Sequence, residues 1–295
     1  MIHITDHTDH KYHMIDNIYK VFIVENVVQY SLINFNTHQI EVCNSDEKPV
    51  EYYFAIDLLF HDAFSHWVYE SAIYLPIFSK LKEIYPTIKI LLKEKKQFKL
   101  LFLKFFNIME TDIVYDIQPR NVCLFPSPIS ALNENNYFTD TYKQILLQFI
   151  TIFSHYNLSN ECRAYDYIIL PRQTKENYKS NDRSYHMELT YEAVRTISQN
   201  YDTLHTDTIV DLKDQIAAVQ SAPNVILTDR SPFMVNNLFC NNQKLFVLDT
   251  ITIQQLSTYI KFNYIREMVC RLHHNSYTYI PTYLVKDQII ELLNN

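Results

Sequence analysis

The sequence predicts an α/β protein of two domains, each built on a parallel sheet, and two observations lead to this expectation. Short apolar runs alternate with helical patterns from about Tyr165 onward, at the spacing of a parallel sheet with right-handed crossovers. The chain has 295 residues, 47% of them hydrophobic, which suits two linked cores better than one. We expect one domain over residues 1–155, a second over 156–280, and a C-terminal helix over 281–295.

The first half of the chain contains strand patterns followed by helical ones. Residues 21–53 alternate apolar and polar side chains, which predicts strands or hairpins at the edge of a sheet. Apolar residues recur at helical spacing over 64–81, and a short buried strand is expected after Pro86. A second amphipathic helix is predicted over 96–108, with a strand in DIVYDI after it. A polar, proline-bearing stretch at 125–140 ends this pattern.

The second half opens with a buried strand, YDYIIL, that ends shortly before Arg172. The elements expected next are a helix over 187–200, a weak strand over 202–206, a helix over 211–221, a strand over 224–227, then a turn, a helix start and a strand that reaches Asp249. This alternation is typical of a Rossmann-like domain.

The stretch 215–249 places a polar turn at the carboxyl end of a buried strand. In open α/β sheets, phosphate-bearing ligands bind at such turns, held by the backbone and by the positive end of the following helix. The expected ligand is a nucleotide or a nucleotide-sugar.

No glycine occurs in the chain, although a usual content of ~7% predicts roughly twenty. The Walker A loop, the G-x-G-x-x-G turn and the G-x-S-x-G elbow are therefore excluded. Turns with positive φ must use asparagine or aspartate, as we expect at residues 133–136, Asn241 and Asn242. Mutational bias towards A/T-rich codons is the favoured explanation.

Composition and charge argue against several classes of partner. The net charge of −7 disfavours nucleic acid, and the basic run at 93–99 is interpreted as the solvated end of a helix. No signal-peptide core and no run of ~20 apolar residues is visible, so we expect no membrane span and a cytoplasmic protein, bacterial or in a virus-infected host cell. Oligomeric state is not predicted. The cysteines fit reduced thiols, being odd in number and far apart: Cys43, Cys123, Cys162, Cys240 and Cys270.

Four histidines near the start have the formal spacing of a metal site on a helix: His3, His7, His10 and His13. We expect a frayed terminus with solvated histidines instead.

Several motifs occur in an order that resembles glycosyltransferase family 61, over roughly residues 60–285. They are His66, Trp67 and Glu70 in SHWVYE, Arg172 in LPRQ, Arg183 and Glu188 in DRSYHMEL, Gln215 and Ala222 in KDQIAAVQSA, and Asn236 and Phe239 after the last turn. Two departures stand beside these matches. The family's His-Gly-Ala is replaced here by Arg230, Ser231 and Pro232, and an asparagine of the second arginine motif is replaced by His186.

The resemblance implies a GT-B-like fold, with two Rossmann-like domains whose parallel sheets face a cleft. It implies an inverting transfer of a hexosyl or pentosyl group from a nucleotide-sugar, expected to be UDP-linked, to a glycan or glycoprotein acceptor. Fixed cations stabilise a leaving diphosphate without a metal, and the chain has no Asp-x-Asp triplet, so we expect no metal or other cofactor. The candidate donor-binding residues are Arg172, Arg183, Gln215, Arg230, Ser231 and Asn236.

An inverting transfer also needs a general base for the acceptor hydroxyl. The cluster FHDAFSHWVYE supplies His66 or Asp62 as this base, with Glu70 one helical turn after His66 to orient it or the acceptor. The alternative is a structural His66–Glu70 pair beneath Trp67, which itself either stacks on a sugar or packs in the core.

Two other classes of function are considered. The first depends on Arg230, which either binds the diphosphate through its planar fork or marks a lost donor site. If the donor site is lost, the chain is a catalytically silent relative that binds a glycan or a partner enzyme. An unrelated nucleotide-sugar epimerase or dehydrogenase is disfavoured, because its dinucleotide needs a glycine turn.

Overall fold

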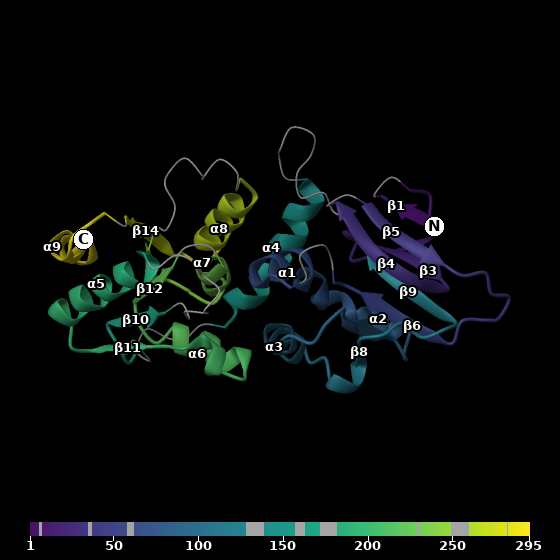
Figure 1. Ribbon diagram of the computed structural model, residues 1–295, viewed down its shortest axis with the longest axis horizontal. Helices are drawn as coiled ribbons and strands as arrows, with labels where there is room; N and C mark the ends of the chain where they lie inside the picture. Colours follow the sequence, from purple (N-terminus) through teal and green to yellow (C-terminus); the bar gives the residue numbers. More distant parts are fainter. Residues whose placement is uncertain are drawn as a thin grey trace. The chain divides into compact units, whose positions relative to one another are not determined.

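The computed structural model describes residues 1–5, 8–34, 37–57, 62–127, 139–156, 163–171, 182–228, 231–248, 260–281 and 283–295. The chain divides into two compact units, Met1–Phe149 and Ile150–Asn295 (Figure 1). Both combine helices with a sheet that is wholly or mostly parallel, so the predicted α/β class is confirmed.

The first unit is built on a six-stranded sheet with the order β2-β3-β9-β6-β7-β8. The strands are β2 Tyr12–Ile15, β3 Tyr19–Glu25, β6 Glu51–Ala55, β7 Lys89–Leu91, β8 Ile113–Val114 and β9 Asn121–Pro126. The strands β9, β6, β7 and β8 are parallel, whereas β2 and β3 are added antiparallel. Only these four strands therefore have the parallel arrangement that is expected of a Rossmann-like domain.

A three-stranded antiparallel sheet covers part of the same core, with the order β1-β5-β4. Its strands are β1 Ile2–Ile4, β4 Val27–Asn34 and β5 Thr37–Val42. Tyr30 and Ile40 from its inner face pack in one cluster with Phe22, Tyr53 and Phe125 of the larger sheet. The strands predicted within 21–53 are confirmed.

The amino terminus is not frayed, and this prediction was wrong. Ile2–Ile4 pairs with the distant strand β5, and Tyr12–Ile15 forms a hairpin with β3, so both segments are ordered by strand pairing. The helix needed for the four-histidine pattern is absent from the described residues, which do not include His7. His13 instead lies 2.8 Å from the Tyr85 hydroxyl.

Helices lie between the parallel strands of the first unit. Between β6 and β7 are α1 Phe64–Glu70, the 3₁₀ helix η1 Ala72–Ile77 and α2 Phe78–Ile84, and between β7 and β8 are α3 Gln97–Phe105 and the 3₁₀ helix η2 Glu110–Asp112. The helix α4 Asp140–Ser154 follows β9 and contains the boundary between the two units. The helices predicted over 64–81 and 96–108 are confirmed, with Pro76 inside η1. The prediction that residues 93–99 are the solvated end of a helix is wrong for Lys99, which is fully buried.

The second unit has a five-stranded, all-parallel sheet with the order β11-β10-β12-β13-β14. Its strands are β10 Tyr167–Leu170, β11 Tyr201–Thr203, β12 Asn224–Thr228, β13 Lys244–Leu248 and β14 Ser276–Ile280. Its helices are α5 Asp182–Ile197, the 3₁₀ helix η4 Thr206–Thr208, α6 Leu212–Val219, α7 Ser231–Asn236, α8 Ile260–Leu272 and α9 Lys286–Asn294. The chain adds β11 on one side of β10 and then adds β12, β13 and β14 on the other side.

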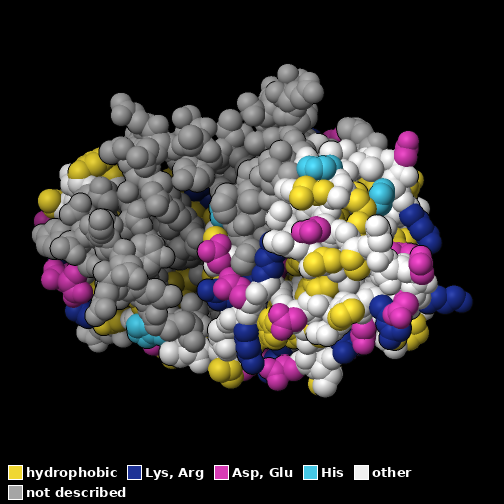
Figure 2. Space-filling model, turned by 45° about the vertical axis from the view of Figure 1, so that its right-hand side comes forward, with side chains coloured by type: hydrophobic (Ala, Val, Ile, Leu, Met, Phe, Trp, Pro, Cys, Tyr) yellow, Lys and Arg dark blue, Asp and Glu magenta, His cyan; other side chains and the backbone are white. Residues whose placement is uncertain are grey.

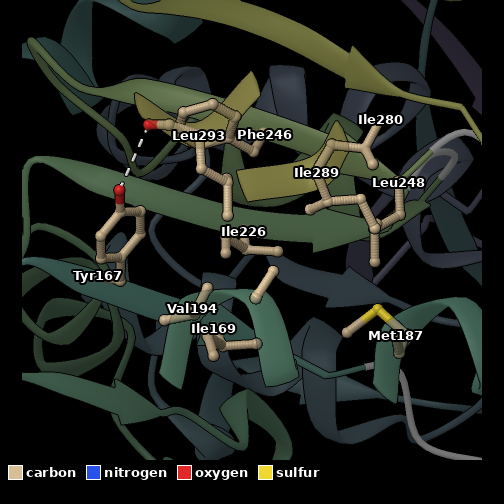
Figure 3. Close-up of a cluster of buried hydrophobic side chains, with 11 residues drawn as sticks. Tyr167, Ile169, Met187, Val194, Ile226, Phe246, Leu248, Ile280, Ile289 and Leu293 are labelled. Carbon is tan, nitrogen blue, oxygen red and sulfur yellow. Dashed lines mark hydrogen bonds between the residues drawn. The ribbon is translucent and has the colours of Figure 1, made fainter. Parts of the chain in front are cut away.

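The core of this unit lies between the sheet and the pair α5 and α9 (Figure 3). Ile226 and Phe246 contact side chains of both helices in one buried cluster. The Tyr167 hydroxyl donates to the Leu293 carbonyl at 3.4 Å, which ties β10 to the end of α9. Side chains alternate along a strand, so Tyr277 points away from the Ile280 side, and its ring meets Phe233 of α7. Both faces of the sheet are thus covered.

Asparagine and aspartate occupy most of the left-handed backbone positions, as a glycine-free chain requires. Among the described residues, the non-glycine positions with positive φ are Asp16, Asn17, Asn26, Asn107, Arg120, Asn242 and His274. The prediction at Asn242 is confirmed, with φ of 50°, whereas the prediction at Asn241 was wrong, because Asn241 is not among these positions. Residues 133–136 lie outside the described part of the chain.

Candidate functional site at the carboxyl ends of the parallel strands

The order of the second sheet reverses between β10 and β12, where open α/β sheets bind their ligands. The two strands pair in register, with Leu170 beside Leu227. Arg172 comes two residues after the end of β10, and Arg230 two residues after the end of β12. Both arginines lie outside the described residues. The strands that lead to them are nevertheless neighbours whose carboxyl ends lie at the same edge.

The last residue of β12 carries a polar group at this edge. Thr228 is 1% exposed, and its hydroxyl has no hydrogen-bond partner among the described residues. A buried hydroxyl without a partner costs free energy, so this edge is suited to receive a polar group.

Two predicted donor-binding residues of the second unit contact each other. Gln215 of α6 donates from Nε2 to Oδ1 of Asn236 at 3.5 Å, and both side chains are buried. Asn236 is the last residue of α7. The pair joins α6 to the helix that begins directly after Arg230.

The other two predicted donor-binding residues are known only by their backbone. Arg183 lies in the first turn of α5, which begins at Asp182 and so before the start of the helix predicted over 187–200, and Ser231 begins α7. Their side chains lie outside the described part of the structure. Glu188 of the same motif is exposed and faces Arg195, 3.8 Å from its Nη1. A helix continues through this motif because its residues have no breaker among them.

In the first unit, His66 and Glu70 form the predicted pair on α1. Glu70 Oε1 lies 2.9 Å from His66 Nδ1, and the side chains are 7% and 26% exposed, respectively. A carboxylate beside Nδ1 accepts a hydrogen bond from the Nδ1–H group, which leaves Nε2 as the nitrogen of the neutral ring that has a lone pair. Asp62 is exposed, in the turn before α1. This arrangement suits a histidine held in one tautomer by a buried acid.

Trp67 packs in the core and does not offer its face to a sugar. It is fully buried, and its ring meets Phe98 and Phe102 edge-on. Its indole Nε1 donates to Oδ1 of Asp57 at 2.7 Å.

Asp57 is the centre of a buried polar network that the sequence reading missed. Its Oδ2 accepts from Lys99 Nζ at 2.6 Å and from the Lys93 backbone nitrogen at 2.8 Å. The Asp57 and Lys99 side chains are both 0% exposed. Asp57 follows β6, so this charge also lies at the carboxyl end of a parallel strand. One feature of the sequence could have indicated that Lys99 is buried. Lys99 lies three residues before Phe102, so both side chains lie on the same, buried face of α3.

The surface carries charges of both signs. Lysine and arginine side chains lie among aspartate and glutamate side chains on the face shown in Figure 2. Within the described residues, no group of three or more histidine, cysteine, aspartate or glutamate side chains is arranged to hold a metal ion. No helix among those residues is both long and apolar enough to span a bilayer. No protein-family model matches the chain, and no curated protein matches it at a significant level.

Proposed function

We propose that this protein is an inverting, metal-independent glycosyltransferase with a GT-B-like arrangement of its two units. The donor is a nucleotide-sugar, with UDP as the first nucleotide to test, and the acceptor is a glycan or glycoprotein. The observation that carries the proposal is the pairing of β10 with β12 at the point where the strand order reverses. It brings together the strand ends that precede Arg172 and Arg230.

The proposed donor chemistry needs positive charge where the diphosphate leaves. A guanidinium binds phosphate oxygens through two parallel hydrogen bonds and stays charged at every working pH. Two such groups, which follow neighbouring strands in the sequence, would stabilise the leaving group without a metal. The Gln215–Asn236 pair supports this role, because it anchors α7, whose first residue follows Arg230 in the sequence.

The proposed acceptor chemistry is assigned to His66. The buried Glu70 holds the imidazole, as the third member of a catalytic triad holds its histidine. His66 then takes the proton of the acceptor hydroxyl as that oxygen attacks the sugar.

The test is nucleotide binding. We expect one of UDP, GDP, CMP or dTDP, or its sugar, to raise the free energy of unfolding by about 2.7 kcal/mol at a concentration of ~100 Kd. Arg172→Ala should lose this stabilisation. Arg195→Ala, which removes an exposed arginine of the same unit, should keep it. A cooperatively folded protein that no nucleotide stabilises would contradict the transferase and leave the silent relative.

A further inference from the structure

The strand β2 ends the six-stranded sheet, and among the described residues no strand pairs with its outer side. In an antiparallel pair, the N–H and C=O groups of successive residues point alternately towards and away from the partner strand. The Lys11 carbonyl accepts from the Ile23 amide at 2.9 Å, so the backbone groups of Tyr12 and Met14 point away from β3. The outer edge of β2 therefore presents the N–H and C=O groups of these two residues for further pairing.

The side chains at the two outward positions are large and apolar. Tyr12 is 47% exposed and Met14 is 50% exposed. The Lys20 ammonium lies 4.9 Å from the centre of the Tyr12 ring. Edge strands are commonly protected from further pairing by a charged side chain or a proline, and neither occurs at these two positions. Pairing along this edge would thus bury apolar surface as well as satisfy backbone groups.

The edge is complementary to a second copy of itself. When two β2 strands lie antiparallel about a two-fold axis between their His13 residues, Tyr12 of each copy is opposite Met14 of the other. Because both residues are at outward positions, each such pair exchanges its backbone hydrogen bonds. The Tyr12 ring then contacts the Met14 thioether, which is a favourable cross-strand pair. The same register places Lys11 opposite Ile15, so no lysine is opposite the lysine of the other copy.

We propose that the protein forms a symmetric dimer in which the two β2 strands pair antiparallel, with His13 of each copy at the two-fold axis. The six-stranded sheet then continues from one copy into the other. A second copy is the favoured occupant of this edge, because a single register matches Tyr12 to Met14 on both sides of the axis. The dimer involves the first unit alone and does not depend on the proposed function.

Sedimentation velocity over a rising series of protein concentrations tests for the dimer. We expect a monomer–dimer equilibrium in which Tyr12→Lys raises the dissociation constant at least about tenfold, because it places a charge on both sides of the interface. Met14→Pro removes an outward N–H, a change that an edge strand tolerates, so it should weaken the dimer while circular dichroism still shows a folded chain.

Val50→Lys is the matched control. It exchanges an apolar side chain of the first unit that is 55% exposed for the same lysine, and it should associate like the wild type. A monomer at every concentration, or a dimer that both Tyr12→Lys and Met14→Pro leave intact, would refute the proposal.

Disulfide formation tests the register. The background carries Cys43→Ser and Cys162→Ser, because Cys43 is exposed and Cys162 lies outside the described residues. At the two-fold axis the His13 Cα atoms form a pair without backbone hydrogen bonds, ~4.5 Å apart, which a disulfide can span. His13→Cys should therefore give a covalent dimer under mild oxidation. Lys11→Cys should not, since it lies opposite Ile15, and equal linking of the two variants would contradict this pairing.

Discussion

At the scale of single residues, the Asp57–Lys99 pair shows how a buried charge is kept tolerable. The carboxylate accepts three hydrogen bonds, from an indole, an ammonium and a backbone amide. Burying either ion alone would cost several kcal/mol, and the partner with its hydrogen bonds offsets that cost. Removing one partner is therefore far worse than removing both.

We predict that Lys99→Met lowers the free energy of unfolding by about 3–5 kcal/mol, because it leaves Asp57 charged and buried. The double variant Asp57→Asn with Lys99→Met should recover part of that loss. Urea unfolding followed by tryptophan fluorescence measures both, since Trp67 is the only tryptophan in the chain and contacts Asp57. Lys104→Met, at an exposed lysine of the same helix, is the control and should stay within ~0.5 kcal/mol of wild type. A Lys99→Met protein as stable as this control would mean that the pair contributes nothing.

His38 gives the molecule a predicted pH dependence. Its pKa falls from 6.5 in the unfolded chain to about 4 when folded, chiefly through burial. Protons then bind the unfolded state more strongly, so this contribution to stability is complete above pH ~6.5 and is lost as the pH falls towards 4. Between pH 7 and pH 5 the loss should be about 2 kcal/mol. Urea unfolding at the two pH values should show a smaller drop for His38→Gln; an equal drop would assign the effect to other groups.

At the scale of elements, the spacing of apolar residues predicted those helices whose formation depends on residues close together in the sequence. The helices over 64–81 and 96–108 were predicted because their apolar side chains repeat at the helical period. The strand β1 was missed because it is ordered by pairing with the distant β5, and β2 was missed although it forms a local hairpin with β3, whose turn places Asp16 and Asn17 at positive φ. The helix predicted over 187–200 begins at Asp182, so it includes Arg183, which the prediction left outside it. Polar composition alone does not separate a loop from an exposed helix turn.

The final helix offers an element-scale prediction with a matched control. Ile289 of α9 is fully buried in the cluster of Figure 3, whereas its neighbour Ile290 is only partly buried against it. Ile289→Ala should cost about 2–5 kcal/mol through the cavity it leaves. Ile290→Ala should cost clearly less. Urea unfolding followed by circular dichroism compares the two, and equal costs would mean that α9 does not pack on the sheet as described.

At the scale of the whole molecule, the sequence predicted α/β architecture with parallel sheets but not the strand orders. Parallel strands were inferred from alternation with helices, a property of chain order. That β10 lies between β11 and β12, and β6 between β9 and β7, depends on contacts far apart in sequence. The His66–Glu70 pair was predictable from a spacing of four residues. The Asp57–Lys99 pair was not, because its two residues are 42 positions apart in the sequence.

The proposed function divides its work between the two units, and variants can separate the two tasks. His66→Ala should lower the rate of sugar transfer by about 10²–10⁴, the usual contribution of a general base. It should leave nucleotide stabilisation unchanged, because the donor is assigned to the second unit. Glu70→Gln, which keeps the shape but not the charge that orients His66, should fall between wild type and His66→Ala. Arg172→Ala should instead lose nucleotide binding.

Transfer is measured by mass spectrometry of glycan acceptors with the nucleotide-sugar that stabilises the protein. A His66→Ala protein that transfers at the wild-type rate would move the base to Asp62 or elsewhere, while nucleotide binding by the second unit would still stand.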